Sequence, residues 1–319
     1  MQTFRRALLC AAAIFAAGGA HAADPWPSRP IHFVVPFGPG GANDLLARAA
    51  AEGASRVLGQ PIIVDNKPGA GAVLGTDFVA KAQPDGYTFL ISAAGVVSNS
   101  MIRKVPYKDA DLVPVAMIGL APSVIIVPAN SPYHDLKDFV AQSKQGKGLH
   151  FSTAGVGSTP HFVEGMLTTE YGAKLDLVPY KSGGESVAAV LGNQVDATSE
   201  ASIVVLPYLK SGRLKALATT WTRRIAAYPE LPTAMEQGFK NVQIAHWAGV
   251  HAPAGTPADV QDKLAAAIDK AMKDPATVEK LRGMGIEPIG GTRASFTKFV
   301  DEERARLGRV VKATGMKDE

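Results

Sequence analysis

Short apolar runs alternate with helical patterns along most of the chain. The run Ile31–Val35 predicts a buried strand, which leads through the glycine-rich turn 36–41 into a helix predicted from about residue 43 to 58. Two more strands, at 61–64 and 87–92, flank a helix predicted over 73–81. A strand–turn–helix repeat of this kind is typical of parallel sheets covered by helices.

The same pattern starts again after residue 123. Strands are predicted at 124–127, 149–152, 175–179 and 214–219, with helices over 136–143, from Thr159, and over 187–191. Thr159 is the expected N-cap, with Pro160 at the first helical position, and Ser182–Glu185 has capping-box spacing. Three further helices, at about 256–273, from Asp274, and at 292–311, are predicted to return the chain to the first unit.

The two units are not separated by a Gly/Ser-rich or low-complexity linker. We therefore expect two α/β lobes, each a mostly parallel sheet flanked by helices, joined by crossovers near 120–125 and 243–250. Lobe 1 is predicted to comprise residues 23–123 and 247–319, and lobe 2 residues 124–246.

The first 22 residues have the pattern of a secretory signal peptide. Arg5 and Arg6 precede an apolar stretch at 7–17 that is too short to span a bilayer, and Ala20-His21-Ala22 is an A-x-A cleavage site. A membrane anchor or a lipoprotein at Cys10 fits less well, and the sequence leaves Sec and Tat export open. We expect cleavage after Ala22 and a soluble, periplasmic mature protein.

Composition narrows the chemistry. Apolar residues make up 46% and charged residues 19% of the chain, the formal charge is +4, and basic residues do not interleave with aromatics. This balance fits a globular protein and disfavours a nucleic-acid-binding surface. Cys10 is the single cysteine, and the glycines at 69–75 miss the dinucleotide-binding spacing by one residue, so we expect no metal site and no cofactor.

Two glycine-rich loops stand out, at 36–44 (PFGPGGAND) and 151–161 (FSTAGVGSTPH). Each follows a predicted strand and precedes a helix, so we expect backbone N–H groups and a helix N-terminus to form a site for an anion there without Lys or Arg. In the first loop, a tight turn with an N-cap explains Asp44 equally well. In the second loop we expect Thr159 to cap the helix, which does not exclude ligand contact by free N–H groups. Asp196 is either a surface turn residue or a cleft residue, and His161 with Glu164 fits a helix-surface pair better than a metal site.

The motifs resemble the Bug-type periplasmic receptors of tripartite tricarboxylate transporters. The similarity is carried by Val35–Gly41 with Asp44 and Arg48, by Val64–Gly71, Gln83–Thr88 and Phe151–His161, and by Val178–Lys181, Gly192–Asp196, Leu231–Thr233 and Trp247 with Ala252–Pro257. It implies a two-lobed, periplasmic-binding-protein-like (Venus-flytrap) fold that closes on a small organic carboxylate, held by main-chain groups and ordered water. Ser182 stands where the family commonly has glycine, and segment 94–100 is variable in the family.

The resemblance and the two loops together give the expected ligand-binding residues. They are Phe37, Gly38, Gly40, Gly41, Asn43, Asp44, Ser92, Ala93, Thr153, Ala154, Gly155, Gly157, Ser158, Thr159, His161, Tyr180 and Asp196.

The leading hypothesis is a monomeric solute receptor, not an enzyme, that delivers a carboxylate to transporter membrane subunits. Two alternatives remain at this point. One is a periplasmic hydrolase using Ser158 or Ser152 with His161, for which no orienting carboxylate is apparent. The other is a sensory receptor that presents the ligand to a signalling partner. The sequence does not identify the carboxylate.

Overall fold

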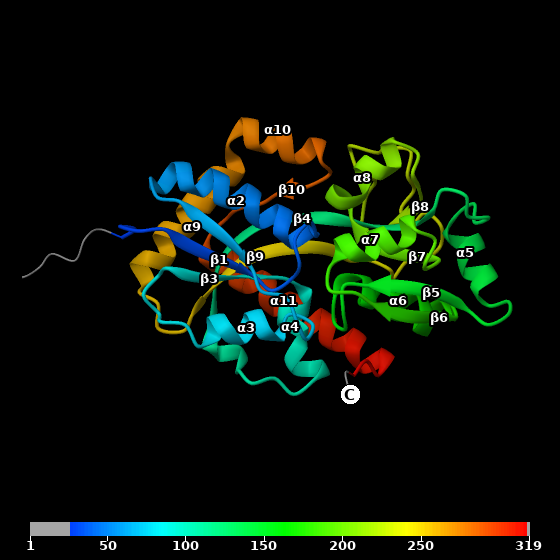
Figure 1. The fold of residues 1–319 in the computed structure, drawn as a ribbon, viewed down its shortest axis with the longest axis horizontal. Coiled ribbons are helices and arrows are strands. Elements are labelled where there is room, and N and C mark those ends of the chain that lie inside the picture. The colour runs from blue at the N-terminus through cyan, green and yellow to red at the C-terminus, as the bar shows by residue number, and fades with distance from the viewer. Residues whose placement is uncertain (1–25, 318–319) are drawn as a thin grey trace, which may run out of the picture.

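The computed structural model describes residues 26–317 and shows two α/β lobes (Figure 1). The sheet of the first lobe contains three parallel strands followed by two antiparallel ones. In order, these are β2 (Ile62–Asn66), β1 (Ile31–Val35), β3 (Thr88–Ser92), β9 (Ala245–Pro253) and β4 (Leu112–Pro128). The helices of this part of the chain are α2 (Ala42–Leu58), α3 (Val73–Ala80) and α4 (Ala94–Ile102), followed by the short 3-10 turn Asp109–Asp111.

The sheet of the second lobe has the same design, with β5 parallel to both of its neighbours and β4 antiparallel to β7 and β8. Its strands are β6 (Leu175–Pro179), β5 (Leu149–Thr153), β7 (Ala197–Ala201), the end of β4, and β8 (Leu214–Thr219). Its helices are α5 (Leu136–Ser143), α6 (Thr159–Tyr171), α7 (Gly183–Leu191) and α8 (Ser202–Lys210).

Strand β4 belongs to both sheets and links the lobes. Its residues 112–122 pair with β9, and its residues from Ser123 onward pair with β7 and β8. The sequence predicted only 124–127 as strand, which is too short. Pro114 disfavoured a strand prediction for the first half of β4, because proline within sheets is normally confined to edge strands and bulges. In the structure, the register of β4 with β9 shifts between Pro114 and Ala116, as at a bulge.

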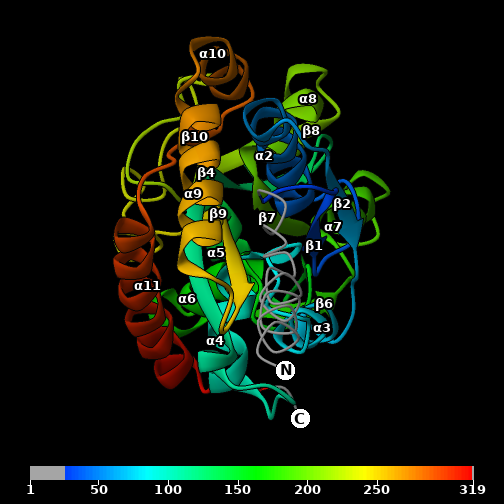
Figure 2. The ribbon, with the colours of Figure 1, turned by 90° about the vertical axis from the view of Figure 1, so that its left-hand side faces the viewer.

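The C-terminal segment covers both lobes. Helix α9 (Ala258–Lys273) packs on α2, and Gly53 permits this, since a Cβ there would lie 2.6 Å from Ala271 Cβ. After α10 (Pro275–Gly283) and β10 (Glu287–Pro288), helix α11 (Arg293–Thr314) packs on α4 and β4 and also on α6 of the second lobe. Figure 2 shows α9 beside α2 and α11 along the flank of the molecule.

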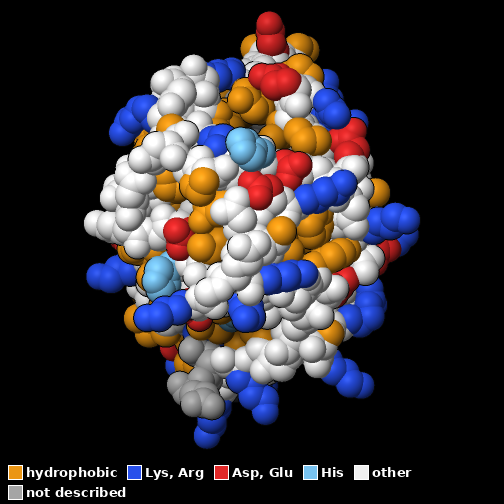
Figure 3. All heavy atoms as spheres, turned by 90° about the vertical axis from the view of Figure 1, so that its right-hand side faces the viewer, with side chains coloured by type: hydrophobic (Ala, Val, Ile, Leu, Met, Phe, Trp, Pro, Cys, Tyr) orange, Lys and Arg blue, Asp and Glu red, His pale blue; other side chains and the backbone are white. Residues whose placement is uncertain are grey.

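The predicted signal peptide lies outside the described residues. Among residues 26–317, no helix is both long and apolar enough to span a bilayer. Figure 3 shows the lobe 2 end of the molecule, where Lys and Arg side chains are spread over the surface instead of gathering in one patch.

Candidate functional site

Four helices begin at one place between the lobes. Helices α2 and α4 follow β1 and β3 of lobe 1, and α6 and α7 follow β5 and β6 of lobe 2. Their first turns surround a small cavity of about 30 Å³, and in the described chain neither Lys nor Arg lines it. The lining residues are Phe37, Gly41, Ala42, Asn43, Ala93, Ala94, Gly95, Ala154, Ser158, Thr159, Pro160, Gly183, Glu200 and His246.

Three of these four helices start without a side-chain cap. The N-caps of α2 and α4 are Gly41 and Ala93, which carry no side-chain acceptor. The N-cap of α6 is Ser158, not Thr159 as the sequence predicted, and its hydroxyl donates to Gly155 O at 2.6 Å. Only α7 is capped, by Ser182 Oγ. The first-turn N–H groups and positive dipole ends of α2, α4 and α6 thus have no side-chain acceptor at the cavity, an arrangement that suits an anion.

The two lobes touch along one side of this cavity. A Cβ placed on Gly38 would lie 3.1 Å from Ser182 Cβ, and one on Gly41 would lie 3.6 Å from the Gly183 nitrogen. The turn before α2 therefore rests directly on the start of α7, and a larger residue at either glycine would meet the opposite lobe. This is the arrangement of a closed cleft.

Asp44 organises the turn and does not line the cavity. Its carboxylate accepts hydrogen bonds from the Gly40 N–H at 3.0 Å, from Arg48 at 3.0 Å and from Asn66 Nδ2 at 3.0 Å. Burial raises the pKa of Asp44, but these three donors outweigh it and hold the pKa below its ordinary value. The prediction that Asp44 contacts ligand is therefore not supported by its position, since its oxygens already have protein partners.

A second hollow, of about 670 Å³, adjoins the first and shares Phe37 and Ala154 with it. Of the predicted residues, Gly155 and Tyr180 line this outer hollow instead of the inner cavity. Arg103 lies here too, and its guanidinium donates to Ala70 O of lobe 1 and to Val156 O of lobe 2. The outer hollow is thus the more cationic of the two spaces.

Several other predicted residues have structural roles close to the cavity but do not line it. Ser92 Oγ donates to Gly249 O, Thr153 Oγ1 accepts from the Gly155 N–H, and Gly157 donates its N–H to His161 Nδ1. Gly38 and Gly40 shape the turn, as described above.

Asp196 lies elsewhere. It accepts the His150 N–H at 2.8 Å, at the amino ends of β5 and β7, whereas the cavity lies beyond the carboxyl ends of the strands. The structure therefore supports the alternative of a turn aspartate.

The geometry does not arrange a serine nucleophile with His161. Ser158 directs its hydroxyl to Gly155 O, while His161 Nδ1 accepts the Gly157 N–H at 3.0 Å. Ser152 is buried and bonds Ser186 Oγ at 2.7 Å. Glu164 accepts from Thr168 Oγ1, and no group of three metal-ligating side chains occurs within residues 26–317.

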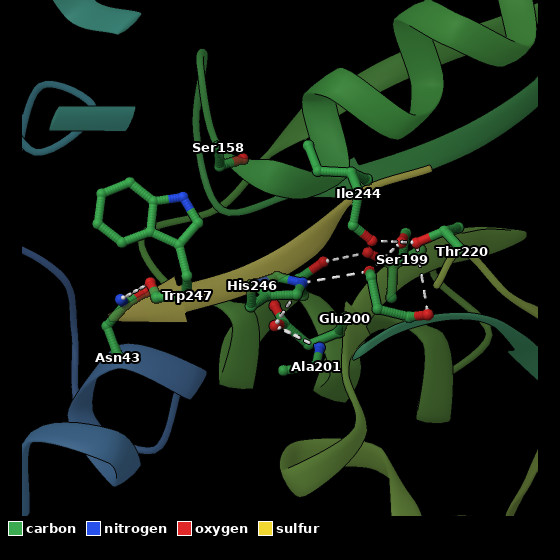
Figure 4. Close-up of polar contacts among 12 residues, drawn as sticks. Asn43, Ser158, Ser199, Glu200, Ala201, Thr220, Ile244, His246 and Trp247 are labelled. Carbon is green, nitrogen blue, oxygen red and sulfur yellow. Dashed lines mark hydrogen bonds and ion pairs between the residues drawn. The ribbon is translucent and has the colours of Figure 1, made fainter. Parts of the chain in front are cut away.

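The sequence missed one part of the site, a pair of buried ionisable residues. Glu200 is the next-to-last residue of β7 and His246 lies at the start of β9, and neither strand was predicted. Glu200 Oε1 accepts the Ala201 N–H at 2.8 Å and lies 3.4 Å from His246 Nε2, as Figure 4 shows. Burial raises the pKa of Glu200 to about 7 and lowers that of His246 to about 3.

Residues 46–316 match the model of the tripartite tricarboxylate transporter family receptor. The chain belongs to this receptor family. The solved periplasmic binding protein BugD is 31% identical, with a TM-score of 0.87 over 92% of this chain and 100% of that one. The Bug-type resemblance and the two-lobed periplasmic-binding-protein fold are thus confirmed. The family consists of solute-binding receptors.

Two similar structures contain carboxylates. A Rhodopseudomonas palustris protein solved with adipate is 30% identical, with a TM-score of 0.88 over 92% of this chain and 99% of that one. MatC from the same organism, solved with bound malate, is 29% identical, with a TM-score of 0.85 over 90% and 100% of the chains.

Proposed function

We propose that this receptor captures a small organic carboxylate between its lobes in the periplasm and delivers it to the membrane subunits of a tripartite transporter. The observation that carries the proposal is the convergence of four helix N-termini, three of them without side-chain caps, on a cavity that no Lys or Arg among residues 26–317 lines. The adipate and malate found in two similar structures are carboxylates that such a cavity suits.

In this proposal, main-chain N–H groups bind the carboxylate of the ligand. Gly41 and Ala93 mark the helix starts on the lobe 1 side, and Ser158 marks the one on the lobe 2 side. A helix N-terminus contributes about 0.3–1 kcal/mol to binding a negative group when exposed, and up to ~2 kcal/mol when partly buried. A ligand that contacts both lobes binds the closed form better than the open form, and so shifts the open–closed equilibrium toward the closed form.

The cellular context is part of the same proposal. We infer export to the periplasm with cleavage after Ala22, a monomeric state, and a division into lobe 1 (23–123 and 247–319) and lobe 2 (124–246). The change of β4 from one sheet to the other at residues 122 and 123 supports the first boundary.

Calorimetry on the purified mature protein with a carboxylate panel that includes adipate and malate tests the proposal. At least one carboxylate should bind, and Gly41→Leu should weaken it at least 100-fold while the free protein stays folded, because the leucine meets α7. The control is Gly283→Leu at the end of α10, where a Cβ meets no atom within 4 Å. No binding by any carboxylate, or equal binding by Gly41→Leu, would overturn the proposal.

A further inference from the structure

One carboxyl group is built into a cavity that otherwise suits an anion. Glu200 is 2% exposed, lines the cavity and packs against the first residue of α7, since a Cβ on Gly183 would lie 1.8 Å from Glu200 Oε2. Its Oε1 takes the Ala201 N–H. Within the described chain no donor serves Oε2, so this oxygen is left for a group inside the cavity.

Among the described residues, neither Lys nor Arg balances this carboxylate. On its far side, His246 Nε2 lies 3.4 Å from Glu200 Oε1 (Figure 4), and burial lowers the pKa of His246 to about 3, so this imidazole is neutral. His246 Nε2 also lies 3.2 Å from Ser123 Oγ. In the described residues the cavity lining has no Lys or Arg. Oε1 has the Ala201 N–H as its donor, but a buried carboxylate oxygen without a donor, as Oε2 is, is costly, so a ligand that brings a donor to Oε2 gains more than one that does not.

We propose that Glu200 receives a hydrogen-bond donor of the ligand, an ammonium group in preference to a hydroxyl. The receptor then selects carboxylates that carry such a donor over plain carboxylates of the same length. This inference rests on the proposed function, and it assigns the two ends of the ligand to different parts of the cavity. The carboxylate meets the helix N-termini of α2, α4 and α6, and the donor meets Glu200 beside α7.

The protonation state of Glu200 provides a second means of testing this selectivity. Burial raises the pKa of Glu200 to about 7, so the group is an acceptor at pH 8 and carries a proton at pH 5.5. The titratable side chain that faces it is His246 on β9, whose pKa is lowered to about 3 by burial. Gly183 on α7, which also packs against Glu200, does not titrate. Preference for an ammonium-bearing ligand should therefore fall on acidification.

The experiment compares matched ligands by calorimetry at pH 8. The probes are three sets that vary the distance between donor and carboxylate: propionate, lactate and alanine; butyrate, 4-hydroxybutyrate and 4-aminobutyrate; succinate, malate and aspartate. In at least one set the amino acid should bind at least tenfold tighter than the unsubstituted acid, with the hydroxy acid between them. Glu200→Gln should reduce this ratio to below threefold.

Glu164→Gln is the matched control, because Glu164 is also a buried glutamate with a pKa raised by burial, yet it lies on α6 outside the cavity lining. It should keep the wild-type ratio. The wild type alone gives a variant-free check: its ratio should fall at least threefold between pH 8 and pH 5.5.

The outcomes separate the two proposals. If carboxylates bind but the ratio is the same in wild type and Glu200→Gln, or does not change with pH, the role of Glu200 is wrong and the carboxylate receptor stands. If no carboxylate in these sets or in the earlier panel binds wild type, the proposed function fails, and the role of Glu200 fails with it.

Discussion

Removing the Asp44 carboxylate should loosen the turn before α2 and lower the free energy of unfolding. In Asp44→Ala, the Gly40 N–H and Asn66 Nδ2 lose a charged acceptor that is 3% exposed. Hydrogen bonds to charged groups are worth about 1.5–3 kcal/mol each. The pair with Arg48 adds little, because the Arg48 side chain is 51% exposed. Since solvent reaches part of the opened turn, we expect a net loss of about 2–4 kcal/mol.

Urea unfolding at pH 7, followed by circular dichroism, measures this loss. Asp262→Ala is the control, because Asp262 pairs with Arg293 at 3.0 Å at the surface and its side chain is 67% exposed. That change should cost less than about 0.5 kcal/mol. A loss below about 0.5 kcal/mol in Asp44→Ala would refute the view that Asp44 holds the turn.

The pH dependence of the stability difference between wild type and Asp44→Ala provides a further test. The pKa of Asp44 is lower in the folded protein than its ordinary value, so its contribution is fully present above the ordinary carboxyl pKa. The contribution is lost as pH falls through the lowered pKa. The stability gap between wild type and Asp44→Ala should therefore narrow in acid, and a gap that widens would contradict the assignment.

Three further changes test other parts of the site. Gly155→Val should weaken carboxylate binding about tenfold or more in calorimetry, because φ is +101° there and a β-branched residue strains the loop; unchanged affinity would contradict this. Ser182→Ala should cost about 1 kcal/mol in urea unfolding by removing the α7 cap, and a neutral result would exclude that capping role. Arg103→Ala should open the free protein, because Arg103 joins Ala70 O to Val156 O across the lobes; small-angle scattering should show a larger radius of gyration, and no change would refute the bridge.

Much of the fold follows from local pattern. The alternation of apolar runs with glycine turns located β1, β2, β3, β5, β6 and β8, and caps located α5 and the start of α7. The elements that were missed carry mixed signals. Strand β7 reads ATSEA, and its polar side chains are buried by packing between β5 and β4, so no apolar alternation marks it.

The sequence predicted part of the site and missed another part, and each outcome has a physical reason. Glycine turns between strands and helices are visible in the sequence, and they placed Gly41, Asn43, Ala154 and Ser158 at the cavity. Glu200 and His246 come from strands far apart in the chain, and only the pairing of β4 with β7 and β9 brings them together. Glu200 also lies beside Gly183 at the N-terminus of α7, and no recognisable sequence motif links these two positions.

A crystal structure with a bound carboxylate found by the panel tests the central claim most directly. We expect the carboxylate oxygens in the inner cavity, within about 3 Å of first-turn N–H groups of α2, α4 or α6 or joined to them by one ordered water. A carboxylate held instead in the outer hollow by Arg103 or Lys181 would contradict the account.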